Sequence, residues 1–193
     1  MVLPFLYMLY DIWKNRKRGP QSLMLKDIGY IIARVLPEKD WTIVEIGPGS
    51  GSLTMYLAYL VYPNKIIVYE KDDRWIPILK ENLSKANLDN VIIKKREIGL
   101  ENIDEEADLI IIDVKNVIDV VKKVKDKAKK YLVIFVIHFE KLSQLIDILD
   151  GFNTEIVWLE EHRVTKTPNG TRFEISGVKF NGFIVIAERT KPS

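Results

Sequence analysis

The stretch TIVEIGPGSGSLTMYLA, Thr42 to Ala58, decides the fold of this chain. The β-branched and apolar residues of Thr42–Ile46 predict a short buried strand, and the apolar spacing of Ser52–Val61 predicts a helix. Glycine stands at every second position between them: Gly47, Gly49 and Gly51. Glycine permits tight turns with positive φ and lets a ligand approach the backbone closely. This order of strand, glycine turn and helix indicates an α/β unit with a ligand at the turn.

Strand-like and helix-like segments alternate along the rest of the chain. Strands are predicted at Lys65–Glu70, Val91–Arg96, Leu109–Asp113, Tyr131–His138, Thr154–Glu161 and Gly182–Ala187. Helices are predicted at Leu25–Leu36, Asp73–Ala86, Val117–Lys130 and Lys141–Leu149. The last two strands have no helix between them, only the turn signal TPNGT at Thr167–Thr171. We therefore expect an α/β fold, a mainly parallel seven-stranded sheet with an antiparallel C-terminal strand pair and helices on both faces.

The composition restricts the class of protein. A chain of 193 residues that is 47% hydrophobic suits one globular domain with a full core. Without cysteine it has no disulfide and no thiolate metal site, so we expect a cytoplasmic protein and no metal. The formal charge of +2 limits any nucleic-acid surface to a local patch.

The N-terminus, MVLPFLYMLYDIW, is apolar but too short to span a bilayer, and it lacks the basic start of a signal peptide. We expect residues 1–20 to form an extension packed on the protein or on a second subunit, with no membrane role. Residues 21–193 are then the functional domain.

Polar side chains follow the predicted strands at the edge where ligands bind. Glu45 immediately precedes the glycine turn, where a carboxylate repels a pyrophosphate but attracts the ammonium of S-adenosylmethionine. Ser52 stands where the dinucleotide motif has its third glycine, which also favours S-adenosylmethionine over NAD. Glu70 can accept hydrogen bonds from a ribose diol, and Glu97 can accept one from an adenine amino group. Asp113 ends a buried strand beside the expected methyl donor.

These residues resemble class I S-adenosylmethionine-dependent methyltransferases with a Rossmann-like fold. More narrowly, they resemble the tRNA (adenine-N1)-methyltransferases that act on adenine 58 of the T-loop. The likeness is carried by RGPQSLMLKDIGYII, EIGPGSGSLT, VYEKDDRWIPILKENL, REIGLENIDEEADLIIIDV and GFIVIAER.

The resemblance implies a role for each matching position. Glu45 and the three glycines surround the methionine part of the cofactor, and Gln21 helps to close its pocket. Glu70 holds the ribose, Glu97 meets the adenine, and Asp113 is the catalytic residue that holds the target adenine by its exocyclic amino group. The implied substrate is tRNA.

Two departures from the family keep other functions open. The segment DVKNVID after the fourth strand lacks the family's proline and tryptophan, and the chain is too short for the family's N-terminal β domain. A small-molecule methyltransferase of the cobalamin-precursor (precorrin) type is therefore an alternative. Another is a noncatalytic subunit that docks on a catalytic partner.

Basic residues supply candidates for RNA phosphate contacts. They are Lys14, Arg16, Lys17 and Arg18 before the domain, Lys94, Lys95 and Arg96 near the ligand edge, and His162, Arg163, Lys166 and Arg172 in the late loop. We expect Trp158 and Phe173 to be core residues, although either could stack on a base. We expect His138 to be an ordinary packed histidine.

Overall fold

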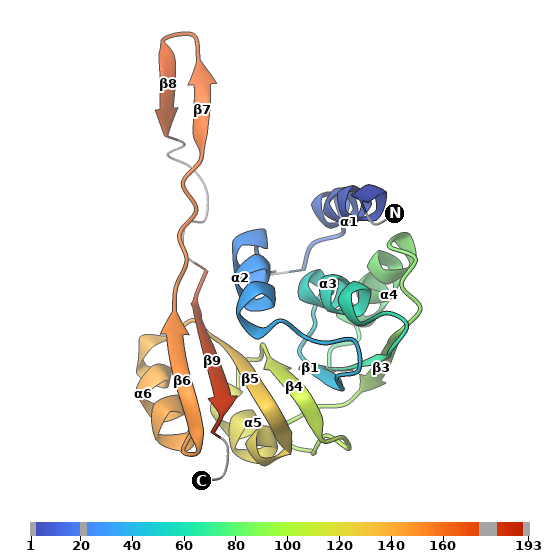
Figure 1. Ribbon diagram of the computed structural model, residues 1–193, viewed down its shortest axis with the longest axis vertical. Helices are drawn as coiled ribbons and strands as arrows, with labels where there is room; N and C mark the ends of the chain where they lie inside the picture. The colour runs from blue at the N-terminus through green and yellow to red at the C-terminus, as the bar shows by residue number, and fades with distance from the viewer. Residues whose placement is uncertain (1–2, 20–22, 174–180, 191–193) are drawn as a thin grey trace.

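The computed structural model describes residues 3–19, 23–173 and 181–190. A single seven-stranded sheet forms the centre, in the order β3-β2-β1-β4-β5-β9-β6 (Figure 1). Its strands are β1 Ile43–Ile46, β2 Ile66–Glu70, β3 Val91–Lys95, β4 Ala107–Ile112, β5 Ala128–Val136, β6 Phe152–Val157 and β9 Phe183–Arg189. Of these, β9 runs antiparallel to both of its neighbours, β5 and β6. The predicted fold class is therefore confirmed.

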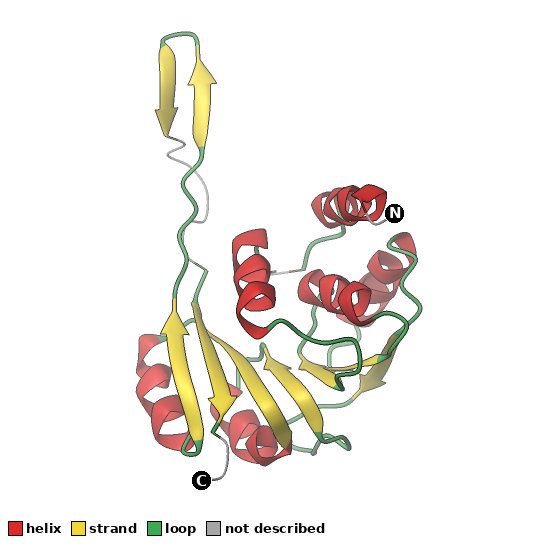
Figure 2. Ribbon diagram, viewed as in Figure 1, coloured by secondary structure: helices red, strands yellow, loops and turns green. Residues whose placement is uncertain are grey.

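Helices cover both faces of the sheet (Figure 2). They are α1 Leu3–Asn15, α2 Leu25–Val35, α3 Ser52–Val61, α4 Trp75–Lys85, α5 Val117–Val124 and α6 Phe139–Ile148. Alternate residues of β4 serve the two faces, since Leu109 packs with α2, α3 and α4 while Ile110 packs with α5 and α6. This alternation explains why the whole of β4 is apolar.

The predicted end of one helix was wrong. The helix expected to reach Lys130 ends at Val124, and after a 3-10 turn at Lys125–Lys127 the chain enters β5. Ala128 pairs with Ala107 of β4, so strand pairing overrides the helical preference of the lysine-rich segment. The predicted strand at Thr154–Glu161 lies slightly earlier, at Phe152–Val157.

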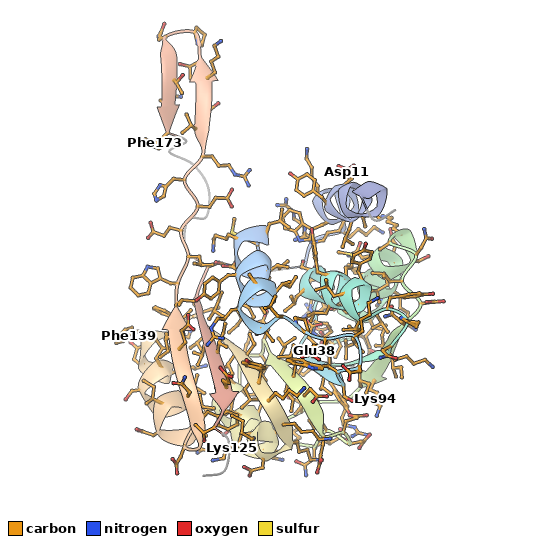
Figure 3. The ribbon with its side chains drawn as sticks, in the orientation of Figure 1. Asp11, Glu38, Lys94, Lys125, Phe139 and Phe173 are labelled. Carbon is orange, nitrogen blue, oxygen red and sulfur yellow. The ribbon has the colours of Figure 1, made fainter. Side chains whose placement is uncertain are left out.

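A two-stranded hairpin, β7 Val164–Thr167 and β8 Gly170–Phe173, lies outside the main sheet. It turns at the predicted TPNGT signal and projects away from the body of the protein (Figure 1). Figure 3 shows Phe173 on this hairpin, far from the sheet, and 66% of the residue is exposed. Trp158, just after β6, is 58% exposed. The expectation that both are core residues was wrong.

The apolar N-terminus forms α1 and lies against α3. Its Leu9 is buried in the same cluster as Leu53 of α3. No helix in the described part of the chain is long and apolar enough to cross a membrane.

Candidate active site

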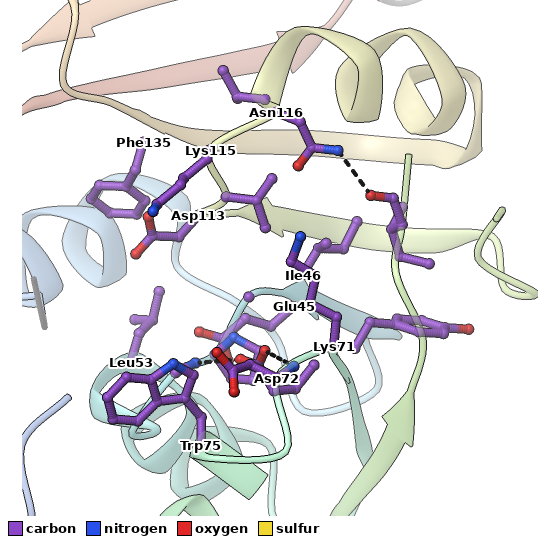
Figure 4. Close-up of a pocket in the computed structure, with 18 of the residues that line it drawn as sticks. Glu45, Ile46, Leu53, Lys71, Asp72, Trp75, Asp113, Lys115, Asn116 and Phe135 are labelled. Atoms are coloured by element: carbon purple, nitrogen blue, oxygen red, sulfur yellow. Dashed lines mark hydrogen bonds between the residues drawn. The ribbon is translucent and has the colours of Figure 1, made fainter. Parts of the chain in front are cut away.

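A cavity of about 700 Å³ opens at the carboxyl ends of β1, β2, β4 and β5. Its size falls in the range of small-molecule sites. The predicted site residues that line it are Glu45, Gly47, Gly49, Ser52, Glu70, Glu97 and Asp113 (Figure 4). Gly51 is not among the lining residues, and Gln21 lies outside the described residues. Segments far apart in the sequence thus meet where parallel strands end.

The glycine turn serves the protein's own packing as well as a ligand. At Gly47, φ is +84°, and a Cβ atom would lie 2.2 Å from the carbonyl oxygen of Asp113. A Cβ atom on Gly51 would lie 2.5 Å from Leu79 Cδ1. Around Gly49, by contrast, no described atom lies within 4 Å of the Cβ position. Gly49 is therefore the glycine of the turn that leaves space for a ligand.

Two carboxylates in the cavity carry raised pKa values. Glu45 is only 3% exposed, and burial together with the charges of Asp113 and Glu70 raises its pKa to about 7. Thr54 limits this shift by donating a hydrogen bond from Oγ1 to Glu45 Oε2 at 2.6 Å. Burial and the charge of Glu70 also raise the pKa of Asp113 to about 7. Crowded carboxylates favour a cationic ligand, which removes their mutual repulsion.

Glu70 is fixed at the end of β2 by backbone donors. Gly49 N donates to its Oε2 at 3.2 Å, and Asp72 N donates to its Oε1 at 2.9 Å. A carboxylate has about four acceptor positions, so further donors can still bind. Glu97, after β3, forms an ion pair with Lys71 at 2.7 Å. The two carboxylates therefore lie along the wall formed by the ends of β2 and β3.

The cavity also contains residues for which no ligand role was predicted. Lys115 and Asn116 follow β4, Phe135 lies in β5, and His138 and Lys141 follow it. His138 is exposed at the start of α6, so the expectation of a packed histidine was wrong. The position of most of these residues just after a strand could have identified them as site residues. Residues that follow the strands of a parallel sheet lie at its ligand-binding edge.

Several predicted phosphate contacts are already engaged within the protein. Arg16 is only 6% exposed. Lys94 pairs with Asp104 and Glu105, and Arg96 also pairs with Asp104. Lys95 pairs with Asp73 at 2.6 Å. The basic run at the end of β3 is therefore largely neutralised and is a weak candidate for binding RNA.

The fit of S-adenosylmethionine rests on these features. Its ammonium and sulfonium carry the positive charge that the crowded carboxylates of Glu45 and Asp113 favour, and the open space at Gly49 admits its methionine part. It has no phosphate to be repelled by Glu45. The side chains present therefore suit this cofactor better than a dinucleotide.

Comparisons with known proteins indicate the family of the chain. The family model of ribosomal RNA adenine dimethylase matches residues 25–164. The tRNA (adenine(57)-N(1)/adenine(58)-N(1))-methyltransferase TrmI of Methanocaldococcus jannaschii is 28% identical over 212 residues, covering 93% of this chain and 75% of the relative.

Solved structures share the fold. A SAM-dependent O-methyltransferase from Thermotoga maritima superposes with a TM-score of 0.83 at 23% identity, over 96% of this chain and 72% of that one. Precorrin-6y C5,15-methyltransferase from Geobacter metallireducens gives a TM-score of 0.78 at 16% identity, over 92% of this chain and 95% of that one.

The predicted cofactor and enzyme class are thus confirmed, together with the likeness to tRNA (adenine-N1)-methyltransferases. Family membership also favours the enzyme over the noncatalytic subunit. The chain belongs to the ribosomal RNA adenine dimethylase family and is a class I methyltransferase that depends on S-adenosylmethionine.

Proposed function

We propose that this enzyme methylates adenine in RNA, and that its substrate is tRNA, modified at N1 of a T-loop adenine. The observation that carries the proposal is the carboxylate of Asp113, which lies in the cofactor cavity with a pKa raised to about 7. Both the family model and the archaeal relative are named for adenine in RNA, and the relative is named for tRNA N1.

Different residues of the cavity would bind different parts of the cofactor. Glu45 would accept hydrogen bonds from its ammonium, Glu70 from its ribose hydroxyls, and Glu97 from its adenine amino group. When bound, S-adenosylmethionine supplies an electrophilic methyl group on a positively charged sulfur. The protein does not need a strong base, since adenine N1 already carries a lone pair.

Asp113 then positions the target base and stabilises charge. Its carboxylate accepts a hydrogen bond from the exocyclic amino group, which aligns N1 with the methyl group. Methylation at N1 makes the adenine ring cationic. A carboxylate beside the ring stabilises that positive charge, and burial of the carboxylate strengthens the effect.

Exposed cations and aromatic rings supply a surface for RNA. Lys115 and Lys141 line the mouth of the cavity, and Lys166 and Arg172 are exposed on the projecting hairpin. Lysine and arginine side chains of this kind bind phosphates, while an exposed ring such as Phe173 can stack on an unpaired base. The proposal assigns the hairpin to RNA outside the active site.

A small-molecule methyltransferase is the second candidate. One observation favours it: this chain spans 95% of the precorrin methyltransferase structure but only 75% of the tRNA-modifying relative. A match along nearly the whole length of a small-molecule methyltransferase structure fits a small substrate.

Methyl transfer from labelled S-adenosylmethionine to unmodified tRNA, followed by nucleoside analysis, tests the proposal. Label in 1-methyladenosine is the expected result, and label in N6-methylated adenosine from ribosomal RNA would reassign the target atom. An enzyme that binds the cofactor but labels neither RNA contradicts the proposal and favours the small-molecule candidate.

A further inference from the structure

Arg16 is a buried cation at the end of the N-terminal helix α1. Its guanidinium lies over the Trp13 ring, with Cζ 4.2 Å from the ring centroid, and its Nη1 donates to Trp13 O at 2.5 Å. Its Nε donates to Ser52 Oγ at 2.8 Å, across 36 residues of sequence. The contact therefore connects the N-terminal segment to a residue that lines the cofactor cavity.

No carboxylate among the described residues forms an ion pair with Arg16. Burial and the charge of Arg18 lower its pKa to about 10, so Arg16 remains protonated at neutral pH. Buried charges in proteins are normally paired, because an unpaired charge loses its hydration without compensation. The arrangement leaves one positive charge behind Ser52 that no carboxylate of the described residues balances.

Through its hydroxyl group, Ser52 can link the charged side chain of Arg16 to a ligand in the cavity. Its oxygen accepts the hydrogen bond from Arg16, so its hydroxyl hydrogen is left to donate to another acceptor. Ser52 is also the first residue of α3, whose first intrahelical hydrogen bond is that from Met55 N to Gly51 O. The backbone N–H groups of the first turn therefore point out of the helix.

The opposite charge lies nearby in the same cavity. Glu45 belongs to the strand before the turn, and Thr54 in the first turn of α3 binds it directly. One wall thus offers a carboxylate and the other offers a hydroxyl backed by a guanidinium. This pairing is complementary to an α-amino acid zwitterion, which carries an ammonium and a carboxylate on one carbon.

We propose that Arg16 is a positioning residue for the α-carboxylate of the cofactor's methionine part, acting through the Ser52 hydroxyl. The N-terminal segment then completes the cofactor site. The proposal concerns the cofactor alone, so its outcome is independent of whether the methyl acceptor is RNA.

Binding of two ligands, measured by isothermal titration calorimetry, tests it. S-adenosylmethionine is compared with its decarboxylated form, which lacks only the α-carboxylate. Arg16→Met keeps an aliphatic stem against Trp13 but removes the charge. We expect this change to weaken binding of S-adenosylmethionine by about 10- to 100-fold, since hydrogen bonds to charged groups are worth more than neutral ones. Binding of the decarboxylated ligand should stay within about threefold of wild type.

Two further variants separate positioning from a merely structural role. Arg16→Lys retains the charge and should recover much of the preference for the carboxylated ligand. Lys17→Gln removes a neighbouring exposed cation, paired with Glu81, and should change neither affinity. Equal losses for both ligands in Arg16→Met would show that Arg16 only anchors α1, and the proposal would be wrong. A wild-type protein that binds both ligands equally would also overturn it.

Discussion

Gly47 and Asp113 lie in direct contact, so that a Cβ atom on residue 47 would stand 2.2 Å from the carbonyl oxygen of residue 113. The contact joins the turn after β1 to the end of β4. It brings the glycine turn and the residue proposed to be catalytic to one place, and it does so through backbone atoms that cannot easily move aside.

Gly47→Ala is therefore expected to damage the fold itself. The new methyl group meets a backbone carbonyl, and the positive φ of +84° adds strain. We expect a loss of about 3 kcal/mol or more in the free energy of unfolding, measured by urea denaturation.

Gly49→Ala is the matched comparison for this effect. Its Cβ position is open and its φ of +54° lies in the left-handed region, so the cost in stability should be only about 1–2 kcal/mol. This variant should fold but bind S-adenosylmethionine more weakly. Equal stability losses for the two alanine variants would contradict the contact described here.

Glu45→Gln is expected to stabilise the protein without cofactor while abolishing cofactor binding. In the unfolded chain this carboxyl titrates near its ordinary 4.5, whereas in the folded protein its pKa is about 7. The stability of wild type therefore falls as the pH rises from about 4.5 through about 7, because the unfolded state releases its proton first.

The glutamine variant lacks this titration. It should exceed wild type in stability by an amount on the order of 3 kcal/mol at pH 8, and by little near pH 4.5. Urea denaturation at the two pH values measures the difference. A stability difference between the two proteins that is the same at both pH values would contradict the raised pKa of Glu45.

Cofactor affinity should depend on pH with a maximum. Below about 7 the carboxyl of Glu45, whose pKa is about 7, must lose its proton before it can bind the ammonium of the cofactor. Near pH 8 a free α-amino group begins to lose its own charge. Affinity should therefore rise towards pH 7, peak between about 7 and 8, and then decline. Calorimetry in buffers of different ionisation enthalpy should detect proton release at pH 6, and its absence there would contradict the raised pKa of Glu45.

Asp113→Ala is expected to retain cofactor binding and lose methyl transfer. Removing a group that stabilises transition-state charge typically costs on the order of 100-fold or more in rate. Single-turnover transfer to tRNA measures the rate, and calorimetry measures the binding. Transfer at the wild-type rate would exclude the role assigned to Asp113.

The hairpin cations should contribute to RNA affinity through electrostatics. Changing Lys166 and Arg172 together to alanine should weaken tRNA binding and reduce the slope of log affinity against log salt by about two. Lys95→Gln is the control, because Lys95 is already paired with Asp73. The assignment of the hairpin to RNA is wrong if the control and the double variant have the same salt slope.

Local pattern was sufficient for most of the fold. The strand, glycine turn and helix of Thr42–Val61 were predictable because hydrophobic periodicity and glycine spacing are visible within a few consecutive residues. The start of β5 at Ala128 was not, because its pairing with Ala107 depends on a residue 21 positions away. The exposure of Trp158 was not predictable either, because an apolar ring does not by itself indicate whether the residue is buried or exposed.

The amino-acid sequence by itself determined an α/β fold with carboxylates and glycines at its ligand edge, since those residue types follow the strands directly, and its resemblance to a known family indicated a methyltransferase. Only the tertiary structure decided which of them share one cavity and which charges are balanced. Arg16 and Lys95 look alike in sequence, as members of short basic runs, yet one is buried behind Ser52 and the other pairs with Asp73. Burial and charge balance depend on neighbours brought together by folding, and no local pattern records them.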